Sequence, residues 1–235
     1  MPDAATRPAR AVLMVHGAGG GGWEWNIWAR VFTAAGWSVR APDLEPSAEG
    51  LVATRLAHYQ AQVSAQLAAL PRPRALVGAS LGGLLALRCA DAADALVLVN
   101  PLPPQPWHTM LPVPRTSDAI EAWGARANLA GTRRAVPDAG TGAAWHAFRR
   151  WRDESGAVIA QARAGVECAV PSCLVLVLAA DADVEVPVEA CKSIAAWCGG
   201  EARTLEGGSH VGALMGRHAA AIAADVVTWL NVKTA

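Results

Sequence analysis

The chain has 235 residues, of which 53% are hydrophobic and 17% are charged. A chain of this length can bury one sizeable core, and its composition is typical of a globular enzyme and excludes a disordered chain. Lys and Arg together number 20, as do Asp and Glu. The formal net charge is zero, so charge does not favour nucleic acid or an anionic membrane as a partner.

The five cysteines are an odd number and show no C-x-x-C spacing, which argues against a disulfide framework and against a zinc site. The segment 1–10 lacks the apolar core of a secretory signal, and the longest apolar run, 173–180, is far too short to cross a bilayer. These features predict a soluble, cytoplasmic protein with no metal, no cofactor and no membrane partner. They leave the oligomeric state open.

Short apolar runs alternate with amphipathic stretches along most of the chain. In chain order the pattern predicts strand 11–16, helix 23–35, strand 37–42, helix 54–70, strand 75–79, helix 81–90, strand 95–100, strand 173–180, helix 188–197, strand 201–205 and a closing helix at about 213–230. Strands that are apolar throughout are buried on both faces, as in a parallel sheet covered by helices. We therefore expect a single α/β domain over residues 1–235, doubly wound around a mostly parallel sheet of about six strands.

A glycine-rich loop, His16-Gly17-Ala18-Gly19, follows the first predicted strand and leads through three more glycines to Trp23. Such a loop can lay a backbone N–H against a carbonyl oxygen, and the predicted pair of donors is the N–H groups of Ala18 and Leu81. The alternative is a phosphate cradle, but neither G-x-x-x-x-G-K-[ST] nor a correctly phased G-x-G-x-x-G with an acidic partner is present. Nucleotide binding is therefore disfavoured.

The motif Gly78-Ala79-Ser80-Leu81-Gly82 joins the predicted strand 75–79 to the predicted helix 81–90. A serine at a sharp strand-to-helix turn is forced into strained geometry, and the flanking glycines remove Cβ clashes with neighbouring elements. The helix N-terminus behind it offers free N–H groups to a developing oxyanion. We expect Ser80 to be a nucleophile; the alternative is a serine that only caps a helix.

An acid and a base follow in the order Ser, Asp, His. Asp183 lies just past the predicted strand 173–180, and a carboxylate there can bind a histidine's Nδ1–H and stabilise the imidazolium. Asp181 competes with it, although the D-x-x-x-P spacing to Pro187 favours Asp183. His210 stands in a glycine-rich approach between the last predicted strand and the last helix, and we expect it to be the general base.

The segment 101–171 interrupts the alternation, shows no convincing strand, and is predicted to be a short, helix-poor cap over the active-site end of the sheet. It carries the four candidate substrate-binding tryptophans Trp107, Trp123, Trp145 and Trp151. Large aromatic side chains would suit an acyl or aryl pocket, but they could equally attach the cap to the body.

On these motifs the chain resembles the α/β-hydrolase superfamily over nearly its whole length outside the insertion. The stretch 16–25 is similar to the H-G-A-x-x-G-x-W-x-W opening of plant-type methylesterases and hydroxynitrile lyases, although that branch usually has His at the place of Gly20. The resemblance implies a catalytic triad of Ser80, Asp183 and His210. It also implies an oxyanion hole at Ala18 and Leu81.

We therefore expect a serine hydrolase that cleaves a small-molecule carboxylic ester or thioester through an acyl-serine intermediate. Two alternatives remain on the same fold. One is carbon–carbon cleavage of the hydroxynitrile-lyase kind, and the other is a receptor that binds a small ligand without turnover.

Overall fold

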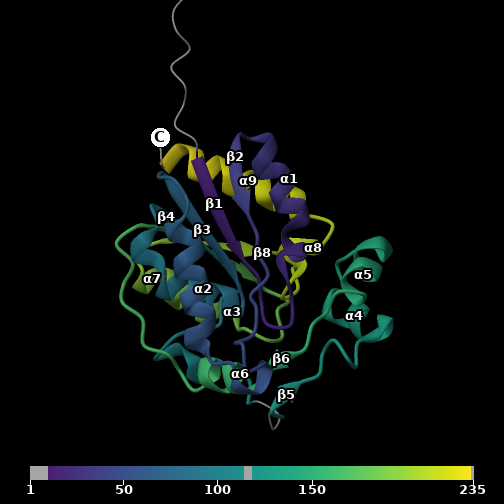
Figure 1. The fold of residues 1–235 in the computed structure, drawn as a ribbon. Coiled ribbons are helices and arrows are strands. Elements are labelled where there is room, and N and C mark those ends of the chain that lie inside the picture. The colour runs from purple at the N-terminus through teal and green to yellow at the C-terminus, as the bar shows by residue number, and fades with distance from the viewer. Residues whose placement is uncertain (1–9, 114–117, 234–235) are drawn as a thin grey trace, which may run out of the picture.

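A central parallel sheet organises the computed structural model, which describes residues 10–113 and 118–233 (Figure 1). Within these ranges the sheet has six strands in the order β2-β1-β3-β4-β7-β8, all parallel. The strands are β1 (Arg10–Val15), β2 (Trp37–Arg40), β3 (Arg74–Ala79), β4 (Ala95–Val99), β7 (Leu174–Ala180) and β8 (Glu201–Leu205). The predicted doubly wound α/β class and sheet size are confirmed. The prediction that the chain carries no secretory signal rests almost wholly on residues 1–9, which lie outside the described residues.

Helices cover both faces of the sheet because the inner strands are apolar on both sides. Leu13 and Val15 of β1 face one buried cluster, whereas Val12 and Met14 face the other. The first cluster is completed by α2 (Leu56–Ala68), α3 (Leu81–Arg88) and α7 (Val188–Trp197), and the second by α1 (Asn26–Ala34), α8 (Gly212–Met215) and α9 (Ala219–Lys233). Among the described helices, none has the length and apolar character that crossing a bilayer requires.

Strand register brings the ends of the central strands to one level. Ala79 pairs with Val99, and Val99 pairs with Leu178. Because the strands are parallel, the residues that follow them meet at the same edge. Ser80 and Asn100, which come directly after β3 and β4, therefore lie side by side at the carboxyl edge.

The helix predicted at about 213–230 is two helices, α8 and α9. Helix α8 ends at Met215 with Gly216 as its cap, and the next backbone N–H, that of Arg217, donates to the carbonyl oxygen of Asp138 at 3.1 Å. This donor is taken by a distant part of the chain, so the helix does not continue. The predicted helix 23–35 likewise begins with a 3₁₀ turn, η1 (Gly22–Trp25).

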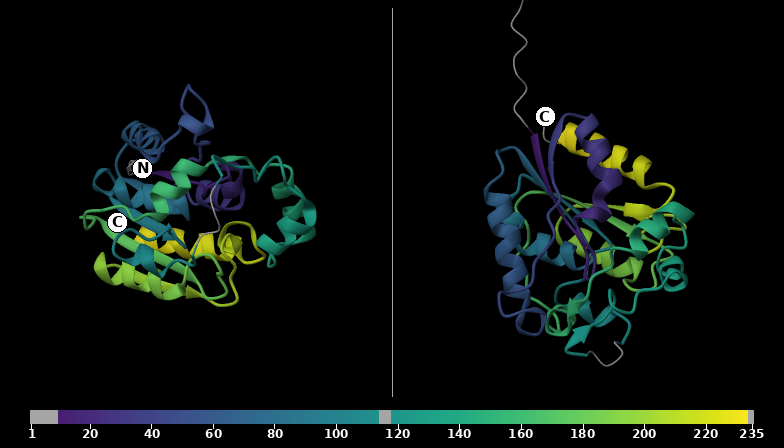
Figure 2. Two further views of the ribbon diagram at one scale, coloured as in Figure 1. Left: turned by 90° about the horizontal axis from the view of Figure 1, so that it is seen from below. Right: turned by 45° about the vertical axis from the view of Figure 1, so that its right-hand side comes forward.

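The segment between β4 and β7 leaves the sheet at its carboxyl edge and contains more helix than predicted. It comprises η4 (Trp107–Met110), β5 (Ile120–Glu121), α4 (Leu129–Ala135), α5 (Thr141–Phe148), β6 (Glu154–Ser155) and α6 (Gly156–Arg163), of which β5 and β6 pair antiparallel. These elements are two to eight residues long, too short to produce a hydrophobic period in the sequence. In Figures 1 and 2, α4 and α5 stand out beside the carboxyl end of the sheet.

Candidate active site

Ser80 occupies a strained turn between β3 and α3. Its φ of 53° and ψ of −120° place a non-glycine residue in a region that L-residues rarely adopt. A Cβ at Gly78 would lie 2.2 Å from the carbonyl oxygen of Gly82, and a Cβ at Gly82 would lie 2.3 Å from that of Val15. The predicted need for both glycines is therefore confirmed.

The loop after β1 packs directly against this turn. A Cβ at Gly17 would lie 3.3 Å from the Ser80 Cβ and 3.9 Å from its Oγ. Ala18, the next residue, lines the same cavity as Ser80. Leu81 is the first residue of α3, so its backbone N–H has no acceptor within the helix. The two predicted backbone donors thus lie on the two segments that flank Ser80.

His210 pairs with Asp183 and not with Asp181. The Nδ1 of His210 lies 2.7 Å from Oδ2 of Asp183, whose side chain is fully buried. The other oxygen of Asp183 accepts the N–H groups of Glu185 and Val186, at 2.7 and 3.1 Å. Asp181 is exposed, and its Oδ1 accepts the N–H of Gly207 at 2.6 Å. These hydrogen bonds fix the Asp183 carboxylate with one oxygen toward the imidazole.

The environment of His210 favours the protonated imidazole. Burial alone lowers the pKa of His210, but the hydrogen bond with Asp183 and the charges of Glu185 and Asp183, with a smaller effect of Glu24 when that group is ionised, outweigh burial. The pKa of His210 therefore lies above its ordinary value. A buried imidazole beside a carboxylate is suited to accept a proton and to hold it as a cation.

Asn100 links the strand ends to the histidine loop. It has a φ of 42°, its Nδ2 donates to the carbonyl oxygen of His210 at 2.7 Å, and its Oδ1 accepts the N–H of Ala180 at 2.7 Å. From the sequence, Asn100 was predicted only to end a strand. The available signal was a polar residue at the end of an apolar strand, level with Ser80.

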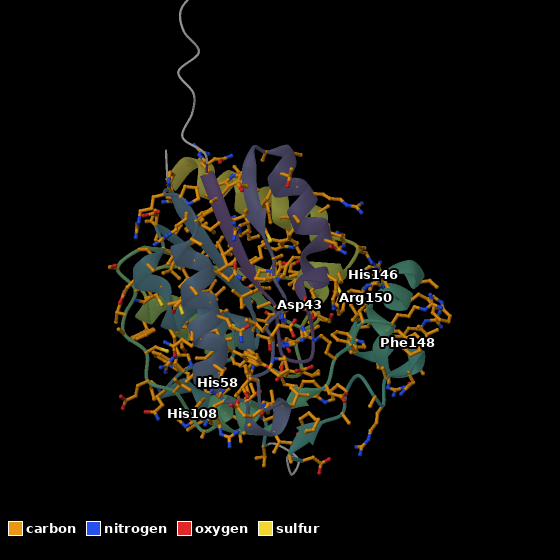
Figure 3. The ribbon with its side chains drawn as sticks, in the orientation of Figure 1. Asp43, His58, His108, His146, Phe148 and Arg150 are labelled. Atoms are coloured by element: carbon orange, nitrogen blue, oxygen red, sulfur yellow. The ribbon has the colours of Figure 1, made fainter. Side chains whose placement is uncertain are left out.

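His16 supports the glycine-rich loop from beneath. Burial lowers the pKa of His16 to about 4, so the ring is neutral. Its Nδ1 lies 2.7 Å from the carbonyl oxygen of Gly17, and its Nε2 lies 2.8 Å from the backbone nitrogen of Leu44. Because the carbonyl can only accept and the amide can only donate, the proton sits on Nδ1. Asp43, at the centre of Figure 3, accepts the N–H of Gly22 at 2.7 Å and holds the far end of the same loop.

A cavity of about 410 Å³ opens over Ser80 and His210. Its wall includes Gly17, Ala18 and Glu24 of the loop after β1, and Trp123, Arg126, Asn128, Thr132 and Trp151 of the insertion. Two of the four predicted substrate-binding tryptophans, Trp123 and Trp151, therefore line the same cavity as Ser80. The Trp151 indole N–H donates to the Thr132 hydroxyl at 3.0 Å, which fixes that ring.

The other two tryptophans lie outside the cavity wall. Trp107 packs against Trp197 of α7, with ring centroids 5.4 Å apart, because η4 lies against α7. Trp145 lies on α5, is 44% exposed and contacts Phe148. Phe148 and Arg150 mark this outlying arm in Figure 3. Neither residue lines the cavity as predicted. Trp107 instead attaches the insertion to the body, and Trp145 lies on the exposed surface of α5.

The insertion is hydrogen-bonded to the loop after β1. The Gly19 N–H donates to Oε2 of buried Glu154 at 3.2 Å, and the Arg152 N–H donates to the Gly19 carbonyl at 2.7 Å. Glu154 also accepts the Tyr59 hydroxyl at 2.8 Å. Burial raises the pKa of that hydroxyl, which keeps it a donor. No local pattern in the sequence indicates Glu154, because Gly19 and Tyr59 are far away along the chain.

The insertion also holds the histidine loop. The hydroxyl and the backbone N–H of Ser209, which precedes His210, donate to the two oxygens of Asp138 at 2.6 and 3.2 Å. Among the described residues, no group of three or more His, Cys, Asp or Glu side chains is arranged to hold a metal ion. The reactive groups at this site are a serine hydroxyl, an imidazole and a carboxylate, with backbone N–H donors beside them.

Comparison with known proteins places the chain in a family. A family model described as "Alpha/beta hydrolase family" matches residues 12–225. The chain belongs to the alpha/beta hydrolase family. This match covers the central sheet except for the first two residues of β1, includes all the site residues named above, and confirms the superfamily resemblance. A comparison with curated proteins found no match.

Solved structures of other alpha/beta hydrolases are similar to this one. Tomato methylketone synthase I superposes with a TM-score of 0.75 at 16% identity, covering 97% of this chain and 100% of that chain. An Arabidopsis methylesterase gives a TM-score of 0.71 at 14% identity, covering 95% and 100%. A pyrethroid hydrolase from Sphingobium faniae gives 0.67 at 19% identity, covering 94% and 98%. At these identities the likeness establishes the shared fold.

Proposed function

We propose that this alpha/beta hydrolase is a serine esterase or thioesterase that cleaves a small-molecule carboxylic ester or thioester through an acyl-serine intermediate. The observation that carries the proposal is the 2.7 Å contact of His210 with Asp183 beside the same cavity as Ser80. Ser80 is the nucleophile, His210 is the general base, and Asp183 orients the imidazole and stabilises the imidazolium. The N–H groups of Ala18 and Leu81 form the oxyanion hole.

The reaction has two halves. Ser80 Oγ attacks the carbonyl carbon while His210 takes the hydroxyl proton, and the carbonyl oxygen becomes an oxyanion facing Ala18 and Leu81. The oxyanion then collapses, and His210 gives the proton to the departing alcohol or thiol. In the second half, water adds to the acyl-serine, its proton passes to His210, and the acid leaves as the proton returns to Ser80.

The insertion supplies the substrate pocket in this proposal. A cavity of about 410 Å³ is of the size that encloses a small organic ligand. Trp123 and Trp151 offer it apolar surface, and we propose that they contact the acyl or alcohol group. The names of the Arabidopsis methylesterase and the Sphingobium pyrethroid hydrolase fit an ester substrate, and we extend that class to this chain.

The test combines active-site labelling with turnover. A fluorophosphonate probe should label the parent protein and should not label Ser80→Ala, and p-nitrophenyl esters or thioesters should be turned over by the parent and not by Ser80→Ala. Ser193→Ala, which removes a partly exposed hydroxyl on α7, is the matched control and should behave as the parent. Labelling that persists in Ser80→Ala would refute the nucleophile. Cyanide release from mandelonitrile without ester turnover would show a lyase, and labelling without turnover of either substrate would favour a receptor.

A further inference from the structure

Glu24 is a buried carboxyl in the wall of the catalytic cavity that the proposed triad does not use. It lies in the η1 turn, is 2% exposed, and lines the cavity together with Ser80 and His210. A second cavity of about 440 Å³, between α1 and α5, also reaches Glu24 and is lined by His146, which Figure 3 shows on α5. A charged group so buried is rare without a partner of opposite charge, so its position calls for a chemical explanation.

The loop after β1 is shaped around this carboxyl. The Gly17 N–H donates to Oε2 of Glu24 at 3.2 Å, and a Cβ at Gly20 would lie 2.3 Å from Oε1. A side chain at residue 20 would therefore displace the Glu24 carboxyl from this position. A Cβ at Gly17 would lie 3.3 Å from the Ser80 Cβ, so the residue that binds the carboxyl lies next to the nucleophile and directly precedes Ala18. Glu24 is thus part of the wall at the carbonyl-binding end of the cavity.

The surroundings of Glu24 favour its uncharged form. Burial raises the pKa of Glu24 to about 8, against the lowering effects of the Gly17 N–H and of His210, while Asp43 raises it further. The other titratable and charged groups that share its two cavities are Glu121, Arg126 and His146 of the insertion, Glu185 after β7 and Arg30 of α1. No basic side chain forms a salt bridge to Glu24 among the described residues.

We propose that Glu24 works as a neutral carboxylic acid whose O–H donates a hydrogen bond to the bound ester beside the oxyanion hole, and that its ionisation stops the reaction. The Gly17 N–H donates to Oε2, so we assign the proton to Oε1 of this cavity-lining side chain. A negative charge here would oppose the oxyanion that forms at Ala18, whereas a neutral donor stabilises it. The inference rests on the proposed ester hydrolysis and deepens it.

The consequence is a bell-shaped pH profile. Activity rises as His210 loses its proton, and it falls again as Glu24 ionises near pH 8. An enzyme that depends on the histidine alone would lose no activity on the alkaline side near that pH. The alkaline limb is therefore specific to Glu24, and it separates a chemical role from a merely structural one.

The experiment compares Glu24→Gln, Glu24→Leu and Glu121→Gln with the parent. Glu24→Gln keeps a donor and an acceptor but cannot ionise, so kcat/KM should stay within about tenfold of the parent and the alkaline limb should vanish. Glu24→Leu should also lose the limb, with kcat/KM lowered by roughly tenfold to hundredfold. Glu121→Gln alters another acid of the same cavity and should keep the limb, whatever its effect on the rate. An alkaline limb that persists in Glu24→Gln, or is missing from the parent, overturns the proposal.

A spectroscopic readout makes the test independent of turnover. Infrared difference spectra between about pH 6 and pH 10 should show the C=O band of a carboxylic acid disappearing in the parent, with no such change in Glu24→Gln. If no ester is turned over, the proposed function fails, and the pH dependence of fluorophosphonate labelling then tests Glu24 at the same serine. A labelling rate without an alkaline limb, or an infrared band that does not titrate, contradicts the role of Glu24.

Discussion

The backbone N–H of Gly19 donates to the carboxylate of Glu154, a residue 135 positions away in the chain. Gly19 belongs to the loop proposed to bind the substrate oxyanion, and Glu154 is the first residue of β6 in the insertion. The cap is thus joined to the loop that would bind the oxyanion by a direct hydrogen bond and by the neighbouring contact from Arg152 to Gly19. Changes in the cap are therefore expected to reach the chemistry.

Glu154→Ala should lower both stability and rate. The change leaves the Gly19 and Ser155 N–H groups and the Tyr59 hydroxyl without their acceptor, which should cost about 2–4 kcal/mol of unfolding free energy and roughly 5–15 °C in Tm. Displacement of the oxyanion loop should lower kcat by about tenfold to hundredfold. Thermal melts and steady-state kinetics check this, with exposed Glu167→Ala in the same insertion as control. Equal effects in both variants would contradict a specific role for the hydrogen bond between Gly19 and Glu154.

Asp183→Asn should lower kcat by about four orders of magnitude. The amide can still lie beside His210, but it no longer enforces the correct tautomer or stabilises the imidazolium. Asp181→Asn should cost much less, because Asp181 is exposed and accepts only the Gly207 N–H among the hydrogen bonds described. Measuring kcat for both variants decides the matter, and a larger loss in Asp181→Asn would contradict the assignment.

Trp123→Ala should change substrate preference, whereas Trp145→Ala should not. The two side chains are nearly equally exposed, at 43% and 44%, but only Trp123 is in the wall of the cavity. Removing a pocket contact should shift the ratio of kcat/KM for an aryl ester and a short acyl ester by about tenfold to hundredfold. Both variants should melt within a few degrees of the parent. An unchanged ratio in Trp123→Ala would mean that this ring does not contact substrate.

The stability of the parent should fall with rising pH in part because of Glu24. Its pKa is about 8 in the folded state and near 4.5 in the unfolded chain, so the folded state holds a proton that the unfolded chain has lost. The contribution is fully present below about pH 4.5 and is lost as pH rises to about 8, by up to roughly 1.4 kcal/mol per pH unit. Glu24→Gln should flatten this slope in denaturant titrations across the range. An identical slope in both proteins would contradict a neutral buried Glu24.

Local sequence patterns were enough to predict the sheet and the Ser80 turn. Apolar strands and the glycine spacing around Ser80 are decided by burial and by close contacts between neighbours, and both leave a mark in the sequence. The choice of Asp183 over Asp181 also followed from the spacing to Pro187. By contrast, Glu154 and Asn100 act through partners 80 or more positions away, which no local pattern records.

The cap was the hardest part to predict for the same reason. Its helices are short, and Trp107 and Trp145 are distinguished from Trp123 and Trp151 only by where the cap folds back. Glu24 was visible in the sequence as an acid between two tryptophans. Its importance depends on the burial and on the space at Gly20 that the structure supplies.

Asn100 holds the histidine loop in place, so substrate binding has little need to order that loop. Both ends of its amide are engaged, one by the Ala180 N–H and the other by the His210 carbonyl, so the histidine loop is anchored to β7 whether or not the cavity is filled. In the proposed reaction the base then meets each substrate preorganised, with little orientational entropy left to lose. Binding energy from the non-reacting part of the substrate can then stabilise the transition state. Substrates that fill the cavity better should therefore show a higher kcat as well as a lower KM.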